Sequence, residues 1–305
     1  MPELILHHFD LSPFAEKARL MLGLKRLAWR SVEIPLVMPK PDLTVLTGGY
    51  RKTPVLQIGA DVYCDTRLIA TELESRYPEP TLFPGGHEGL SLALAAWSDR
   101  AFFEPGAGLS MGLNMSGLPE AVIADRKAFF NFMDFGTLDA QIPHLTTQLR
   151  AHLDLLERQL ADGRPFVLGG APGLADVQAY FPVWMVRGHV PIAGALLAPY
   201  RRIAAWEARV AAIGHGERSP LAAADAHAIA RASRPDPGRG VDPDDPLALA
   251  EGDEVLVAPD DYGRDPVRGA LVTLTVHEIA VRRSAPAVGT VVVHFPRIGY
   301  RIERA

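Results

Sequence analysis

"DLSPFAEKARLML", residues 10–22, combines a helix start with an apolar stripe. Ser12 stands directly before Pro13; serine is favoured as a helix cap and proline at the first helical position. The apolar residues that follow are spaced as on one face of a helix: Phe14, Ala18, Met21 and Leu22. The stretch predicts a helix that begins beside Ser12, and it raises the question of whether the Ser12 hydroxyl serves only as a cap.

The sequence around this helix alternates between strand-like and helix-like segments. Short β-rich runs begin at Leu4, Trp29 and Pro54, and the last of them follows the turn-rich segment TGGYRK. After residues 64–66 (CDT) comes a helix with Ile69, Leu73 and Tyr77 on one face, which Pro78 ends. Residues 1–80 are therefore predicted to form a small mixed sheet covered by helices.

Helical spacing replaces strand-like alternation from about residue 90. The clearest run is Leu149, Leu153, Leu156 and Leu160, which Gly163 ends. In the stretch GLADVQAYFPVW, Pro182 suggests a kink, and Asp176 is placed to accept the N–H of Gly173 at a helix start. We expect residues 88–232 to form an all-helical domain.

The last third of the chain changes character twice. Residues 233–249 mix proline, glycine and charge with little to bury, so they are expected to be a linker. Residues 250–305 show short alternating runs, such as Val255 with Val257 and Val291 with Val293, between turns rich in Gly, Pro and Asp. They predict a small all-β domain resembling an SH3-like barrel.

Whole-chain properties narrow the possible partners and compartments. The 305 residues carry a formal net charge of −5 with scattered basic residues, which argues against nucleic acid or an anionic membrane as partner. No apolar run is long enough to span a bilayer, and the N-terminus lacks the pattern of a secretory signal. The single cysteine, Cys64, suits a reducing compartment, so a cytoplasmic location is expected.

Several familiar site motifs are absent from the sequence. The ten histidines include no HExxH motif, and no metal site is expected. There is no Gly-x-Ser-x-Gly elbow and no P-loop, and the glycines after Gly106 have the wrong spacing for a dinucleotide loop. The acidic residues of the expected linker resemble a calcium loop only loosely.

Three spaced motifs in residues 1–80 resemble the thioredoxin-like domain of the glutathione transferase superfamily. SPFAEKAR, from Ser12, is similar to the first-helix segment of the omega and tau classes. TPVL, from Thr53, resembles the family's cis-proline segment, and Asp65-Thr66 stands where Glu-Ser is usual. With the helical domain that follows, the resemblance covers roughly residues 1–215, and it implies a homodimer.

The resemblance implies a glutathione site. Ser12 would hold the sulfur, where its hydroxyl and the helix N-terminus favour thiolate over thiol. The start of the second helix, Asp65-Thr66, would hold the γ-glutamyl end, and Lys52 the glycyl carboxylate. Within the segment from Thr53 to Val55, Pro54 in the cis form would turn the backbone of Val55 outward, so that Val55 pairs with the cysteinyl part in a β-like contact.

Simpler explanations exist for the same residues. Ser12 and the pair Asp65-Thr66 each stand at a predicted helix start, where Ser, Thr and Asp are typical capping residues without any ligand. Phe9, Phe102, Phe103, Met111 and Met115, which could line a cleft for an apolar second substrate, have the spacing of core residues. Cysteine stands at the Ser12 position in the omega class, so this chain departs from the proteins that favour thiol exchange.

The first function expected is conjugation of the glutathione thiolate to a small apolar electrophile, a detoxification reaction with glutathione as co-substrate. The alternative is a non-catalytic binding or scaffold protein that acts through a protein partner of the C-terminal β domain. Conjugation chemistry does not require this additional domain, so the domain favours the alternative. A glutathione-dependent peroxidase is a third possibility, because that chemistry does not require a cysteine at the first helix.

Overall fold

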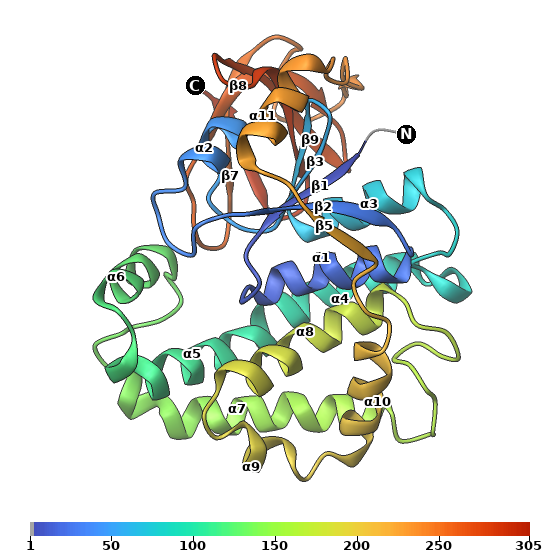
Figure 1. Cartoon of the computed structure of the whole chain (residues 1–305), viewed down its shortest axis with the longest axis vertical. Coiled ribbons are helices and arrows are strands. Elements are labelled where there is room, and N and C mark those ends of the chain that lie inside the picture. Colours follow the sequence, from blue (N-terminus) through green and yellow to red (C-terminus); the bar gives the residue numbers. More distant parts are fainter. Residues whose placement is uncertain (1–2) are drawn as a thin grey trace. The chain divides into compact units, whose positions relative to one another are not determined.

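The computed structural model describes residues 3–305 of the chain, which form two compact units (Figure 1). The first unit contains residues 3–15, 28–72 and 217–305, and the second contains residues 16–27 and 73–216. In the part of the chain that is described, no helix has both the length and the apolar character needed to cross a bilayer.

The N-terminal residues form a thioredoxin-like arrangement. Its elements in chain order are β1 (Leu4–His8), α1 (Pro13–Leu24), β2 (Ala28–Glu33), α2 (Pro41–Thr47), β3 (Val55–Ile58), β4 (Asp61–Cys64) and α3 (Thr66–Arg76). Strand β1 pairs parallel with β2 and antiparallel with β3, which in turn pairs antiparallel with β4. Sequence reasoning identified neither β4 nor α2; Gly59, with φ 63°, lies in the tight turn that connects β3 to β4.

Helices make up most of the second unit. They are α4 (Glu88–Ala96), a π-helical turn (Trp97–Phe102), α5 (Phe103–Asn114), α6 (Glu120–Phe129), α7 (Leu138–Gln159), α8 (Leu174–His189), α9 (Ala193–Leu197) and α10 (Arg201–Ala211), with short 3₁₀ turns at Pro84–Gly86 and Met115–Gly117. The four leucines of the α7 repeat are all buried, as their spacing predicts. Pro182 lies inside α8, and the helix continues through it to His189.

The C-terminal residues are rich in strands. Strand β5 (Glu217–Pro220) pairs parallel with β2, and α11 (Ala223–Ala232) follows it. The remaining strands are β6 (Gly240–Val241), β7 (Glu254–Pro259), β8 (Val267–Leu274), β9 (Glu278–Ala285), β10 (Gly289–Pro296) and β11 (Tyr300–Arg304). Strands β7 to β10 form a meander, and β11 returns to pair with β7, an order that matches an SH3-like barrel.

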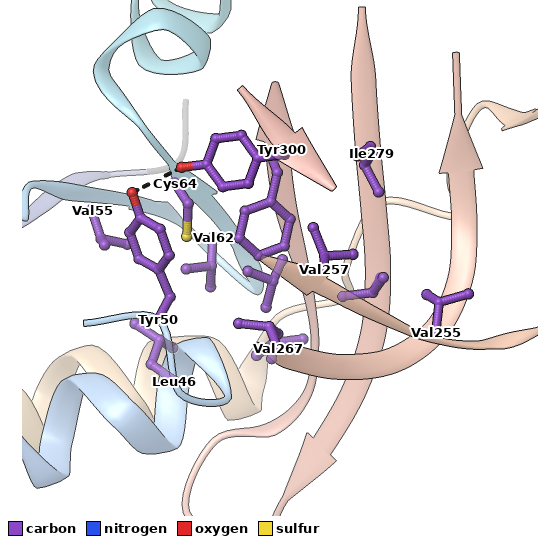
Figure 2. Packing of buried hydrophobic residues seen from close by; sticks show 14 of the residues in the cluster. Leu46, Tyr50, Val55, Val62, Cys64, Val255, Val257, Val267, Ile279 and Tyr300 are labelled. Carbon is purple, nitrogen blue, oxygen red and sulfur yellow. Dashed lines mark hydrogen bonds between the residues drawn. The ribbon is translucent and has the colours of Figure 1, made fainter. Parts of the chain in front are cut away.

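The C-terminal strands continue the thioredoxin-like sheet. Strand β10 pairs parallel with β4, with Val293 opposite Val62, so the order β11-β7-β8-β9-β10-β4-β3-β1-β2-β5 is unbroken. The two groups of strands also share one hydrophobic core, in which Val55, Val62 and Cys64 pack with residues of the C-terminal strands (Figure 2). Burial of apolar surface across the β4–β10 junction stabilises it, because each such side chain contributes about 1.5–3 kcal/mol when fully buried.

Residues 233–249 belong to the first unit and are hydrogen-bonded to other parts of it at several points. The backbone N–H of Asp236 donates to Asp61, and that of Asp242 donates to the carbonyl of Leu274. The carboxylate of Asp245 pairs with Arg297 at 3.1 Å. Although this segment has little apolar surface to bury, its polar groups hold it along the C-terminal strands.

Candidate functional site

The sheet register brings three predicted segments to one end of the thioredoxin-like sheet. His7 near the end of β1 lies opposite Val55 at the start of β3, and Val55 lies opposite Cys64 at the end of β4. The residues that follow β1, precede β3 and follow β4 therefore share this end. They include Ser12, Pro54 and Asp65.

Ser12 caps helix α1. Its Oγ accepts the N–H of Ala15 at 3.1 Å, and its own N–H donates to the carbonyl of Phe9. The side chain is almost fully buried. The hydroxyl therefore satisfies one N–H of the first helical turn with an oxygen lone pair, and this contact does not use the hydroxyl proton.

The predicted cis-proline segment runs into the interior strand of the sheet. The peptide bond between Thr53 and Pro54 is cis, and the Thr53 hydroxyl lies 3.4 Å from the carbonyl of His7. Val55 belongs to β3, which has β1 on one side and β4 on the other. Thr53 lies just outside the strand, before the proline.

Asp65 and Thr66 form the start of α3. Asp65 has φ 78°, a left-handed conformation that few residues other than glycine adopt, and its Oδ1 accepts the N–H of Arg67 at 2.9 Å. Thr66 is the first helical residue and is buried. The aspartate thus caps α3 and places a negative charge at a helix N-terminus, where the helix dipole favours it.

Lys52 is bound by the loop between β7 and β8. Its Nζ lies 2.5 Å from Oδ1 of Asp261 and 4.3 Å from the centre of the Tyr262 ring. This loop belongs to the β domain, about 200 residues away in the sequence. The structure therefore places a residue of the C-terminal strands against a residue that the sequence predicts to bind a ligand carboxylate.

A pair of tyrosines, one of them on β11, connects the predicted site to the C-terminal strands. The hydroxyl groups of Tyr50 and Tyr300 are 3.0 Å apart (Figure 2). Tyr300 also donates to Oδ2 of Asp65 at 3.3 Å. Burial and the nearby Asp65 charge raise the pKa of both phenols well above its ordinary value, so both stay protonated. Sequence reasoning missed this pair, and nothing in the sequence near either tyrosine indicates the contact.

Cys64, directly before Asp65, lies in the core. Burial above all, with a contribution from Asp65, raises the pKa of its thiol well above the ordinary value. A cysteine reacts as its thiolate, so this environment keeps Cys64 unreactive. Within residues 3–305, no group of three or more His, Cys, Asp and Glu side chains is arranged to hold a metal ion.

The aromatic residues considered for a second substrate lie in different environments. Phe102 and Phe103 are buried in the helical unit, where Phe102 stacks on Trp97 and Phe103 packs near Phe181. Phe9 is half-buried in the first unit and lies 5.4 Å from Nζ of Lys40. The helical unit also has a pocket of about 270 Å³ between α5 and α7, whose lining includes Glu104, Phe132, Met133, Leu145 and His152.

Comparison with known proteins supports the same family at both domains. The glutathione S-transferase N-terminal domain family matches residues 6–81, and its C-terminal domain family matches residues 139–209. A glutathione S-transferase from Rhodospirillum rubrum is similar in fold, with a TM-score of 0.53 and 24% identity over 68% of this chain and 87% of that one.

Two further proteins are similar over different extents. FtsZ-localized protein A of Caulobacter vibrioides is 31% identical over 107 residues, which is 33% of this chain. The matched part spans only 46% of that curated relative's length. A GST-like protein from Pseudomonas syringae is 39% identical, with a TM-score of 0.80 and full coverage of both chains, so its likeness includes the C-terminal strands. The chain described here belongs to the glutathione transferase superfamily.

Proposed function

We propose that the protein binds glutathione at the end of the sheet marked by Ser12, Pro54 and Asp65, and conjugates it to a small apolar electrophile. The observation that carries the proposal is the register His7–Val55–Cys64, because it gathers three segments that are distant in the sequence. Membership of the superfamily supports the choice of glutathione as ligand.

In this proposal Ser12 activates the thiol. The hydroxyl accepts the Ala15 N–H and donates its own proton to the sulfur, so one group both caps the helix and binds the thiolate. The positive end of the α1 dipole lowers the pKa of the bound thiol further. The thiol proton leaves to solvent, the thiolate attacks carbon, and a carbon–sulfur bond replaces the bond to the leaving group.

The remaining contacts are proposed from the family resemblance. Asp65 would bind the γ-glutamyl ammonium, and the Thr66 hydroxyl and α3 N-terminus would bind its carboxylate. Because Val55 lies in an interior strand, the β-like contact with the cysteinyl part is assigned to Thr53, within the Thr53–Val55 segment. Lys52 is the cation at the glycyl end.

The test compares Ser12→Ala with Ser12→Thr in the full-length chain. Calorimetric titration measures glutathione affinity, and conjugation of a generic aromatic electrophile measures turnover. Loss of a hydrogen bond to a thiolate predicts a fall in turnover of roughly 10- to 100-fold for Ser12→Ala, with a higher pH needed for activity. Loss of the cap lowers the free energy of unfolding by about 1 kcal/mol.

Ser12→Thr is the control, because threonine keeps a hydroxyl at the same position. It should recover both turnover and stability in large part. If Ser12→Ala loses stability but turns over as fast as wild type, Ser12 is a helix cap only. If the wild-type chain binds neither glutathione nor a glutathione ester, the thiol site itself is wrong.

A protein-binding role is the second candidate, favoured by the 31% identity to FtsZ-localized protein A over 107 residues. Its test is co-sedimentation of the purified chain with polymers of purified FtsZ. Saturable co-sedimentation that the Ser12→Ala change leaves intact supports a binding function separate from the thiol site. A chain that stays in the supernatant at all polymer concentrations argues against it.

A further inference from the structure

The glycyl end of the proposed glutathione site already contains a carboxylate. Asp261 pairs with Lys52 at 2.5 Å, and both side chains are largely shielded, with 26% and 14% of their surfaces exposed. The ring of Tyr262 lies 4.3 Å from the same Nζ. A second carboxylate that approached Lys52 would therefore meet the negative charge of Asp261 at close range, where the interaction is only partly screened by water.

The loop that carries Asp261 is held in place by its own contacts. Arg264 donates from Nε to the carbonyl of Asp261 and from Nη2 to the carbonyl of Asp260, both at 2.8 Å. The N–H of Asp260 donates to the carbonyl of Gly299 at 2.9 Å, which ties the loop to the turn before β11. Tyr262 is buried. These contacts orient the Asp261 side chain toward Lys52.

The γ-glutamyl end of the proposed site also contains a carboxylate, that of Asp65. Tyr300 and the Arg67 backbone contact Asp65 through an O–H and an N–H, both of which are uncharged donors. An ammonium group brought to Asp65 is attracted by the carboxylate charge, and Tyr300 fixes the carboxylate orientation through its bond to Tyr50. A ligand whose γ-glutamyl end carries an ammonium group and whose opposite end is uncharged therefore meets no like charge at Asp65 or at Asp261.

We propose that Asp261 is a specificity-determining residue that makes this site prefer γ-glutamyl thiols whose far end carries no negative charge, such as glycyl amides or esters, over glutathione itself. The inference rests on the proposed thiol site. Its physical basis is that an uncharged end avoids both repulsion by Asp261 and the cost of breaking the Lys52–Asp261 pair.

The experiment is calorimetric titration of the full-length chain with glutathione and with glutathione glycyl monoethyl ester. The wild type should bind the ester at least about tenfold more tightly, since a like-charge contact costs at least that much. Asp261→Asn removes the charge but keeps the side-chain shape. It should raise the affinity for glutathione by about tenfold or more and change that for the ester by less than about threefold.

Asp265→Asn is the matched control, because Asp265 is an exposed residue of the same loop and the same formal charge is removed. It should change neither affinity by more than about twofold. Equal affinity of the wild type for the two ligands overturns the inference while the thiol site stands. Failure of both ligands to bind the wild type and Asp261→Asn overturns the thiol site, and this inference with it.

Discussion

At the scale of single residues, His294 is a buried cation that joins the two groups of strands. Its Nδ1 lies 2.5 Å from Glu278 on β9, its Nε2 lies 3.2 Å from Asp61 on β4, and its ring stacks on Tyr63. Burial opposes the charged form, but the two carboxylates outweigh it and raise the pKa of His294 from 6.5 to about 9. The imidazolium therefore links β10 and β9 to the thioredoxin-like sheet.

The raised pKa of His294 predicts that the folded chain loses stability as the pH rises above neutral. Charged His294 makes its full contribution to the free energy of unfolding below about pH 6.5. That contribution is lost as the pH rises through the folded-state pKa of about 9. The wild-type free energy of unfolding should fall by on the order of 3 kcal/mol over this range. Urea unfolding at several pH values measures it.

His294→Gln is the comparison, because glutamine can hydrogen-bond but does not carry a charge. Its unfolding free energy should be lower than that of wild type near neutral pH and should depend less on pH between about 6.5 and 9. If the two chains lose stability in parallel across this range, the His294 charge does not stabilise the junction.

Ser12 fits two interpretations of the sequence, a helix cap and a group that binds a thiolate. The capping bond to Ala15 is what the Ser-Pro pair predicts, and the buried hydroxyl lies at the same end of the sheet as Pro54 and Asp65. A cap uses an oxygen lone pair, whereas a thiolate contact uses the hydroxyl proton. The sequence motif alone cannot separate the two roles, which is why stability and turnover are measured together in Ser12→Ala, with Ser12→Thr as the control.

At the scale of elements, the start of α8 depends on one buried carboxylate. Asp176 accepts the N–H of Gly173 at 3.0 Å, the N–H of Val167 at 2.8 Å and Nε1 of Trp206 at 2.8 Å. The sequence predicted the bond to Gly173, which needs only a helix start three residues away. The other two partners lie outside the helix and could not be identified locally.

Asp176→Ala should destabilise the helical unit strongly. It leaves three buried donors without their acceptor, which predicts a loss of at least about 3 kcal/mol in the free energy of unfolding. Trp206→Phe removes only one of the donors and predicts a smaller loss from hydrogen bonding, about 1–2 kcal/mol. Chemical denaturation checks both, and a loss below about 1 kcal/mol for Asp176→Ala would contradict this explanation.

At the scale of the whole molecule, the N-terminal and C-terminal strands share a sheet and a core. Val55, Val62 and Cys64 pack in the same cluster as Val255, Val257 and Val267 (Figure 2). Removing residues 250–305 would expose this face and leave β4 as an unpaired edge strand, which promotes aggregation. A β domain attached by a flexible linker alone would leave the rest of the chain intact.

We therefore expect that a chain ending at residue 249 does not fold as a stable monomer. Circular dichroism and size-exclusion chromatography should show reduced structure or aggregation, while the full-length chain unfolds cooperatively. Hydrogen exchange of the full-length chain provides a test without truncation, because amides of β4 and β10 should exchange together. A monodisperse truncated chain with wild-type unfolding behaviour contradicts the shared-core explanation.

The sequence by itself determined which parts of the chain are rich in helices or strands, the α1 start at Ser12, the cis-proline segment and the family resemblance, because these depend on neighbouring residues and short motifs. Only the tertiary structure decided that β10 joins β4, that Asp261 pairs with Lys52 and that Tyr300 contacts Asp65. These contacts join residues more than 200 positions apart. Which residues meet in these contacts depends on sheet register and on shared burial. Neither produces a pattern among neighbouring residues of the sequence.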